Sequence, residues 1–529
     1  TARTGIDVTG GHIDLVDNSR IRVGTGDDLQ IYHDNTHNIF KSINGHISLQ
    51  APAGSEIQLA QGGGGTFEHG VRFIVGSSVE LYHNNSKKLE TTTTGAKVTG
   101  ALEVTQEYPS IRPTLDLNFA ATKTLDRRIT FTRDSLGTYT DELGVLKYAS
   151  NNVPRFDHDP TTSESLGLLI EESRTNLITY SSNLSTNVVT TGVNITSESS
   201  VVAPDGDTGK VFKAAPTTSN SVHHYRYDNN NSSAGTFTSS IWAKNAGGGS
   251  VRLHLSGSSN YGGSNPNVYV DLTDGSVTSY NASNSTYSVT SYKDGWYRIS
   301  LTSTSSGAQS SWLYIMPNSD FGTFAGNGTD GVYVWGAQQE QGTFPTSYIP
   351  TSGSTVTRAA DFATIKGTNF TDFYNQNEGT LFSEFTIKDD TYSSAAIANI
   401  NQEPGASYAY SIMFVEVGTA NGYFGRTYKN SSGIQISNSS SILNSLHPST
   451  TPQTVSFGYT TATGGTLAAY WNGNFVSDSS DLSKVPTTLT NMRIGAGWNG
   501  TDVINAHIRK LSYYNKRLPN AQLQGLTQQ

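Results

Sequence analysis

The sequence predicts an all-β protein, with a β-repeat arm followed by two antiparallel β-sandwiches. Charged residues make up only 15% of the 529 residues, and 53 residues are glycine, a composition typical of strands and tight turns. Short stretches in which apolar and polar residues alternate recur along the chain, as in half-buried strands. Two stretches are nearly the same, Leu-Gln-Ile-Tyr-His-Asp-Asn at 29–35 and Val-Glu-Leu-Tyr-His-Asn-Asn at 79–85, which indicates internal repeats.

The composition also excludes several classes of protein. The formal net charge is −9, which repels phosphate backbones and anionic membrane surfaces, so we expect no nucleic acid partner. The chain has no cysteine, so neither disulfides nor thiolate sites contribute. No window approaches 18 uninterrupted apolar residues and the first residues form no signal segment, so we expect no membrane insertion.

The first region, residues 1–107, is predicted to be a fibre arm of short strands, among them 13–15, 47–49 and 57–59. It contains 29 large apolar residues (Val, Ile, Leu, Phe and Tyr) and no tryptophan. These are too few to bury a core of its own, because each repeat has a single small apolar face. We therefore expect three identical chains to pool these faces in a homotrimer.

The repeated Tyr-His pairs allow two interpretations. Tyr32–His33 and Tyr82–His83 each precede a turn, so the ordinary interpretation is a hairpin end that faces solvent or a neighbouring strand. Alternatively, His33 or His83 of three chains would meet on a threefold axis and hold a metal ion or an anion, a geometry that metals accept.

The second region, residues 108–175, is predicted to be a separate junction domain. It follows a break marked by Pro109 and Pro113, and it contains alternating strands at 115–119 and 129–135 and a buried strand at 166–170. Glu171 and Glu172 are adjacent, so in a strand they point to opposite faces rather than toward one bond. Their predicted role is to pair with Arg174.

The third and fourth regions are each predicted to be a β-sandwich. Residues 176–357 hold four of the six tryptophans, and their strands are expected at 237–244, 251–255, 268–272, 296–301, 312–315 and 332–335. Residues 358–529 have strands expected at 380–385, 411–417, 453–458, 467–471 and 508–513. Asn472-Gly473 predicts a tight hairpin, and 519–525 predicts a helical turn that begins with proline.

Several motifs resemble bacteriophage tail fibre and receptor-binding proteins, notably those of marine and cyanobacterial phages. Residues 28–34, 87–92 and 98–100 are similar to their fibre repeats. Arg-Phe-Asp-His-Asp-Pro at 155–160, with Gly-Leu-Leu-Ile-Glu-Glu-Ser-Arg-Thr-Asn-Leu at 167–177, resembles a segment of phage structural proteins. So do Trp-Gly-Ala-Gln at 335–338, Phe-Pro-Thr-Ser-Tyr-Ile-Pro-Thr at 344–351 and Thr-Arg-Ala-Ala-Asp at 357–361.

This resemblance implies a homotrimeric fibre with jelly-roll distal domains. Residues 176–357 resemble a carbohydrate-binding module, and residues 358–529 resemble a concanavalin A-like or laminin G-like domain. The implied partners are other virion tail proteins and a bacterial surface polysaccharide. The implied location is the extracellular virion, after assembly in the cytoplasm of the host bacterium.

An enzyme is not predicted. Glycoside hydrolases need two carboxylates that face one bond, and glucanases related to these sandwiches supply them from a Glu-x-Asp-x-x-Glu strand, which this chain lacks. Glu384 and Glu416 stand alone in apolar strands. Each is expected to be a paired or rim carboxylate rather than a catalytic acid.

The candidate sugar contacts are aromatic planes beside polar groups, because a pyranose has an apolar face and a ring of hydroxyls. The best loop is 495–502, where glycines present Trp498 beside Asn499 and Asp502; Tyr261, in a glycine-rich turn, is a second candidate. Calcium is the other inorganic candidate, with Asp205 and Asp207 as ligands. Asp-Gly-Asp is, however, also typical of a simple turn.

The predicted function is a phage tail fibre adhesin that binds a bacterial surface glycan for host recognition. One alternative is a purely structural virion appendage or assembly protein, whose sandwiches hold neighbouring subunits together. The second alternative is a polysaccharide depolymerase.

Overall fold

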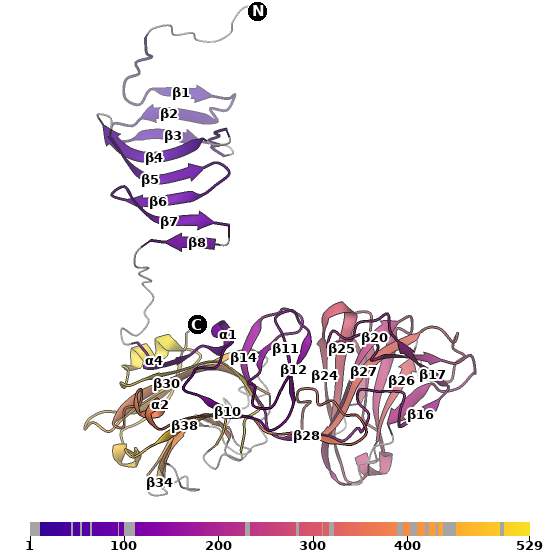
Figure 1. Ribbon diagram of the computed structural model, residues 1–529. Coiled ribbons are helices and arrows are strands. Elements are labelled where there is room, and N and C mark those ends of the chain that lie inside the picture. The colour runs from indigo at the N-terminus through magenta and orange to yellow at the C-terminus, as the bar shows by residue number, and fades with distance from the viewer. Residues whose placement is uncertain are drawn as a thin grey trace, which may run out of the picture. The chain divides into compact units, whose positions relative to one another are not determined.

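The computed structural model describes residues 11–43, 46–52, 55–63, 66–93, 95–99, 112–227, 233–281, 285–308, 310–316, 322–388, 395–402, 410–417, 423–429, 432–436, 451–497 and 502–528. The chain divides into two compact units, Thr1–Gln106 and Glu107–Gln529 (Figure 1). The first unit is the arm, and the second contains both sandwiches. Strands predominate in both, so the all-β prediction is confirmed.

The arm consists of two antiparallel sheets in which each strand pairs with its neighbour in sequence. The first sheet contains β1 (Arg20–Val23), β2 (Leu29–His33) and β3 (Asn38–Ser42). The second contains β4 (Glu56–Gly63), β5 (Thr66–Ile74), β6 (Val79–His83), β7 (Ser86–Thr92) and β8 (Gly95–Val98). The repeated stretches form the equivalent strands β2 and β6, whereas the strands predicted at 13–15 and 47–49 do not form. Within the described part of the arm, neither stretch pairs with a strand.

The outer sandwich of the second unit packs a seven-stranded sheet against an eight-stranded one. The first sheet has the order β10-β29-β38-β31-β32-β33-β34, and the second has the order β13-β14-β39-β30-β35-β36-β37 with β9 beside β39. The strands are β9 (Leu115–Leu117), β10 (Thr130–Thr132), β13 (Phe156–His158), β14 (Ser165–Ile170), β29 (Phe362–Lys366), β30 (Glu378–Ile387), β31 (Ala395–Asn401), β32 (Tyr410–Val417), β33 (Tyr423–Lys429), β34 (Ser432–Ile436), β35 (Gln453–Thr460), β36 (Leu467–Trp471), β37 (Asn474–Ser479), β38 (Asn491–Ile494) and β39 (Ala506–Tyr514).

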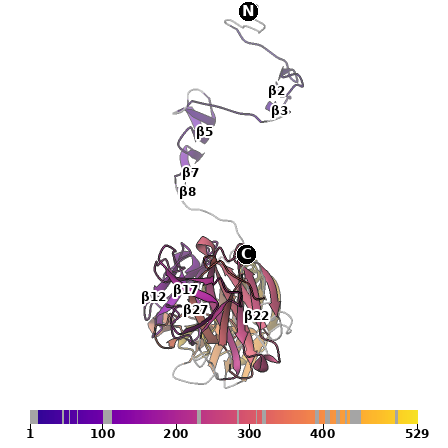
Figure 2. The same cartoon turned by 90° about the vertical axis from the view of Figure 1, so that its right-hand side faces the viewer.

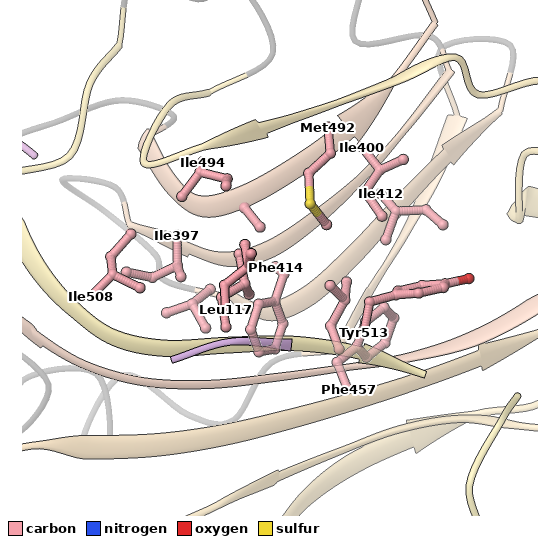
Figure 3. Close-up of a cluster of buried hydrophobic side chains, with 14 of the residues drawn as sticks. Leu117, Ile397, Ile400, Ile412, Phe414, Phe457, Met492, Ile494, Ile508 and Tyr513 are labelled. Carbon is pink, nitrogen blue, oxygen red and sulfur yellow. The ribbon is translucent and has the colours of Figure 1, made fainter. Parts of the chain in front are cut away.

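Residues 108–175 do not form the separate junction domain that we predicted. Their strands complete the sheets of the outer sandwich: β9 and β14 pair with β39, and β10 pairs with β29. Leu117 and Phe131 belong to the same buried core as Ile508 and Tyr513, and Figure 3 shows Leu117 among these side chains. These short strands bury their apolar faces against strands from the C-terminal region of the chain, so they belong to the outer sandwich.

The inserted sandwich lies, in sequence, between β14 and β29. Its two six-stranded sheets have the orders β16-β19-β26-β21-β22-β23 and β17-β18-β27-β20-β25-β24; in Figure 2, β17 and β27 mark one layer and β22 the other. The strands are β16 (Val188–Thr191), β17 (Val193–Glu198), β18 (Val211–Pro216), β19 (His224–Tyr227), β20 (Gly235–Ala246), β21 (Ser250–Ser256), β22 (Asn267–Asp271), β23 (Val277–Asn281), β24 (Ser285–Ser291), β25 (Trp296–Ser305), β26 (Ser310–Met316) and β27 (Gly331–Gln341).

Two ribbons and a few short helices complete the second unit. The ribbon of β15 (Arg174–Asn176) and β28 (Val356–Arg358) pairs the segment that leaves the outer sandwich with the segment that returns to it. The other ribbon is β11 (Gly137–Thr140) and β12 (Leu146–Ala149). The helices are α1 (Phe119–Thr122), α2 (Thr368–Thr371) and α4 (Asn520–Leu526), with single 3-10 turns η1 (Ser258–Tyr261), η2 (Lys293–Gly295) and η4 (Leu482–Lys484).

Most of the strands predicted in the two sandwiches are present. Asn472 and Gly473 both have positive φ, 44° and 78°, between β36 and β37, as a two-residue hairpin requires. The predicted C-terminal turn is α4, which follows Pro519. Trp242, Trp296 and Trp335 are fully buried in one cluster of the inserted sandwich.

Candidate functional site

A cluster of five buried charged residues lies where the chain passes between the two sandwiches. We call Arg133, Arg155, Glu171, Arg358 and Asp361 the charge cluster; their side chains are 0% exposed. Nη1 of Arg155 donates to Glu171 Oε2 at 2.7 Å, and its Nη2 donates to Asp361 Oδ2. Nη1 of Arg133 donates to Asp361 Oδ1 at 3.1 Å. Each carboxylate therefore serves more than one cation, as buried charges require.

The electrostatics of the charge cluster indicate a structural role. Burial alone would raise the pKa of Glu171, but the charges of Arg358 and Arg155 outweigh it and hold the pKa well below its usual range. The backbone N–H of Ser347 also donates to this carboxylate at 2.9 Å. A carboxylate held ionised by paired cations is neither a proton donor nor an open ligand site.

The predicted pairing of the adjacent glutamates with Arg174 is half correct. Glu172 pairs with Arg174 through Oε1, whereas Glu171 faces Arg155 and Arg358 in the charge cluster. The two carboxylates have different partners, and both residues lie after the end of β14 rather than within a strand. They do not form an acid and base pair.

An open cleft of about 480 Å³ lies beside β15, and we call it the ribbon cleft. A cleft of this volume is in the usual range for small-ligand sites. It combines side chains from the ribbon with side chains from β20 and the end of β27. Its lining residues are Glu172, Ser173, Arg174, Thr175, Leu177, Ser233, Phe237, Gln341 and Gly342.

The ribbon cleft is half polar and half apolar in character. Phe237 is 2% exposed and is part of its wall, while Ser173 and Gln341 are exposed to solvent. Arg174 stacks over Phe344, with its guanidinium carbon 5.3 Å from the ring centroid, and donates to the carbonyl of Gln341. The guanidinium therefore already has an aromatic, a carboxylate and a carbonyl partner.

Of the four predicted sugar contacts, the structure describes Asp502 and Tyr261. Trp498 and Asn499 lie outside the described residues. Asp502 is partly buried, and its carbonyl accepts from the N–H of Gly497 at 2.8 Å, which closes the base of the loop. Tyr261 was expected to present an exposed ring, but it is 6% exposed and belongs to the core of the inserted sandwich. The turn buries this ring beneath the sheets because its apolar area is large.

The predicted calcium ligands have a cationic partner from the chain itself. The Lys210 ammonium lies 2.7 Å from Asp207 and 3.7 Å from Asp205, and the Tyr148 hydroxyl donates to Asp205 at 2.7 Å. In the part of the chain that the structure describes, no group of three or more metal-ligating side chains occurs. Asp205 and Asp207 therefore form a turn closed by a lysine.

Two of the remaining candidate residues, His33 and Glu384, have ordinary partners. His33 Nδ1 lies 3.1 Å from Asn38 Oδ1 on the neighbouring strand, and His83 is exposed. Glu384 pairs with Arg509 at 2.6 Å, so its predicted role as a paired carboxylate is confirmed. The side chain of Glu416 lies outside the described residues. None of the described helices is long and apolar enough to cross a membrane.

The arm has an unusual distribution of side chains between its two faces. Along the second sheet, one cross-strand row is apolar on all five strands: Leu59, Val71, Leu81, Leu89 and Val98. Leu59 is 57% exposed and Leu81 is 40% exposed. The first sheet repeats this pattern with Ile21, Ile31 and Phe40 in one row, which are 44%, 40% and 48% exposed. We call these rows the apolar face of the arm.

The opposite face of the second sheet is closed by ion pairs. Glu80 is only 5% exposed, and it lies 3.3 Å from Arg72 and 2.9 Å from Lys87. Arg72 also pairs with Glu56, and Lys87 with Glu90. Among the described residues, none of the buried apolar clusters includes an arm residue. The second sheet thus shields Glu80 and exposes Leu59 and Leu81, the reverse of what a self-contained sheet does.

Comparisons with known proteins return only distant structural likenesses. No family model and no curated protein matches the chain. The CBM40 of a Ruminococcus gnavus IT-sialidase bound to α2,3-sialyllactose is 11% identical, covering 29% of this chain and 84% of that one, with a TM-score of 0.24. The binding domain of botulinum neurotoxin DC in complex with rat synaptotagmin II is 16% identical, covering 32% and 40%, with a TM-score of 0.24. Trypanosoma rangeli sialidase with the inhibitor DANA is 12% identical, covering 60% of each chain, with a TM-score of 0.23. At these TM-scores, none of the three likenesses indicates a family or a function for this chain.

Proposed function

We propose that the chain is the adhesin of a bacteriophage tail fibre, a homotrimer that binds a bacterial surface polysaccharide. In this proposal the arm joins three chains, and the second unit meets the glycan outside the cell, on the virion. Other virion tail proteins are the remaining proposed partners. No catalytic role is proposed.

The apolar face of the arm is the observation that carries this proposal. Exposing a row such as Leu59, Leu81 and Val98 to water is unfavourable by about 25 cal/mol per Å² of apolar surface. Contiguous exposed apolar surface is typical of an interaction site. The occupant that we propose is the same face of two further copies, because each copy supplies an identical row and the charged face is already neutralised by its own ion pairs.

Glycan binding is proposed for the second unit. The ribbon cleft offers hydroxyl, amide and carboxylate groups beside an apolar wall, the combination that sugar recognition needs. The loop at 495–502 is a second proposed contact through Trp498, Asn499 and Asp502. Its base is anchored where the N–H of Gly495 donates to Ile397 and the N–H of Ile504 donates to Gly495, each at 2.8 Å.

The test is saturable binding of the purified full-length chain to cells and to purified surface polysaccharides from a panel of bacterial strains. An adhesin binds some strains and competes with phage adsorption. Absence of binding across the panel would favour the purely structural virion appendage. Release of new reducing ends from a purified polysaccharide would instead favour the depolymerase.

A further inference from the structure

We infer that the ribbon cleft binds a neutral polyhydroxyl unit, such as an uncharged hexopyranose, and discriminates against carboxylated or sulfated sugars. This inference rests on the proposed function and assigns a ligand class to one site within it. Its basis is that Glu172 and Arg174, two charged residues in the cleft wall, pair with each other.

Among the described residues that line the cleft, only Glu172 and Arg174 are charged. Nε and Nη2 of Arg174 both face Oε1 of Glu172. Nη1 of the same guanidinium donates to the carbonyl of Gln341, and Phe344 covers one of its faces. A guanidinium recognises a carboxylate or sulfate by presenting paired N–H groups. Here those groups already have partners within the chain, so an anionic ligand finds no uncompensated cation.

The remaining polar groups of the cleft suit hydroxyls. Oε2 of Glu172 takes part in no hydrogen bond or ion pair within the described chain, so this oxygen accepts from a ligand O–H but repels a ligand anion. The hydroxyls of Ser173 and Thr175 and the amide of Gln341 both donate and accept. Leu177 and Phe237 supply the apolar part of the wall. A neutral sugar ring carries both kinds of surface.

The experiment uses the full-length chain on an array of neutral hexose oligosaccharides and their uronic acid counterparts. Ser173 is exposed and lies outside the strands, so Ser173→Trp fills the cleft without disturbing a sheet. Thr273→Trp is the matched control, because Thr273 is an exposed turn residue of the inserted sandwich away from the cleft. We expect Ser173→Trp to weaken binding of neutral oligosaccharides at least about tenfold, and Thr273→Trp to leave it unchanged.

A second variant tests the selectivity. Glu172→Gln removes the anion that neutralises Arg174, so we expect this variant to gain affinity for uronic acid oligosaccharides relative to the wild type, with a cooperative thermal transition as the check on folding. Wild-type binding of neutral probes that persists in Ser173→Trp would overturn the inference and leave the proposed function standing. So would a wild-type preference for uronic acids. If no probe or host polysaccharide binds the wild type, both the inference and the proposed function fail.

Discussion

Arg133 and Asp361 lie 228 positions apart in the chain, yet Nη1 of Arg133 donates to Oδ1 of Asp361 at 3.1 Å with both side chains fully buried. Arg133 follows β10, and Asp361 directly precedes β29, the strand with which β10 pairs. The other carboxylate oxygen of Asp361 accepts from Arg155 and from the N–H of Glu171. The Asp361 carboxylate thus contacts three segments of the chain, at the position where the inserted sandwich returns to the outer one.

We predict that Asp361→Asn destabilises the second unit by about 3–5 kcal/mol. The substitution removes the charge that compensates Arg133 and Arg155 and leaves buried cations without a sufficient anionic partner. Urea denaturation followed by tryptophan fluorescence measures this change. The buried tryptophans of the inserted sandwich report on its unfolding.

Glu164→Gln is the matched control for this experiment. Glu164 pairs with Arg509 at 2.9 Å but is 59% exposed, so its loss changes the free energy of unfolding by less than about 1 kcal/mol. Equal small effects of Asp361→Asn and Glu164→Gln would show that the charge cluster does not hold the sandwiches together.

A second prediction concerns the limits of the outer sandwich. A fragment of residues 358–529 lacks β9, β10, β13 and β14, and with them the core residues Leu115, Leu117, Phe119, Ile129, Phe131, Leu168 and Ile170. We expect this fragment to show no cooperative thermal transition by circular dichroism, whereas a fragment of residues 112–529 should melt cooperatively. A sharp transition in the shorter fragment would contradict the assignment of these strands.

The sequence predicted individual strands well, because alternation and turn residues act locally. It did not predict the insertion of one sandwich into the other, because that depends on pairing between distant segments. Leu117 of β9 lies opposite Leu511 of β39, and no local pattern around either residue specifies its partner. The boundaries predicted at 107/108 and 175/176 therefore do not separate residues 108–175 from the outer sandwich.

The motifs that resemble phage proteins have a physical explanation in the structure. They supply four members of the charge cluster: Arg155 from 155–160, Glu171 from 167–177, and Arg358 and Asp361 from 357–361. The segment 344–351 adds Ser347, whose hydroxyl and N–H donate to Glu171. These motifs specify how the two sandwiches join, and the 167–177 motif also supplies one wall of the ribbon cleft. The ribbon cleft was missed because it combines residues near 173, 237 and 341 that have no common sequence signal.

The third prediction is a loss of stability in acid that involves His254. The pKa of His254 is lowered to about 4, mainly by burial and to a smaller extent by the charges of Arg252 and His224. In the unfolded chain a histidine has a pKa of about 6.5, so the unfolded state binds more protons as the pH falls from about 6.5 to 4, and unfolding becomes easier. We expect the melting temperature to fall across this range. His254→Gln should reduce the fall by a few °C.

His37→Gln serves as the control for the pH series, because the His37 side chain is 72% exposed in the arm. The melting curve of the second unit should follow the wild type at every pH in this variant. An unchanged pH dependence in His254→Gln would assign the acid sensitivity to other groups, such as His224, whose pKa burial also lowers to about 4.

The fourth prediction compares Trp498 with a core tryptophan. Trp498→Ala should weaken attachment to host cells and leave the melting temperature unchanged if the loop at 495–502 contacts the glycan. Trp335 is 1% exposed, so Trp335→Ala should lower stability by about 3–5 kcal/mol. A similar loss of stability in Trp498→Ala would show that this ring is part of the core instead.

The last prediction tests the apolar face of the arm. Leu81 lies at the centre of the five-strand row and is 40% exposed in the single chain, so in a trimer Leu81→Lys would bury three ammonium groups close together. Like charges in a buried interface are strongly unfavourable. Sedimentation equilibrium at micromolar concentration should show trimers for the wild type and monomers for Leu81→Lys. Lys97→Gln is the control, because Lys97 lies on the charged face and is 66% exposed, and it should remain trimeric. A compact wild-type monomer with a cooperatively melting arm would show that the apolar face needs no second copy, and the fibre proposal would then have to be abandoned.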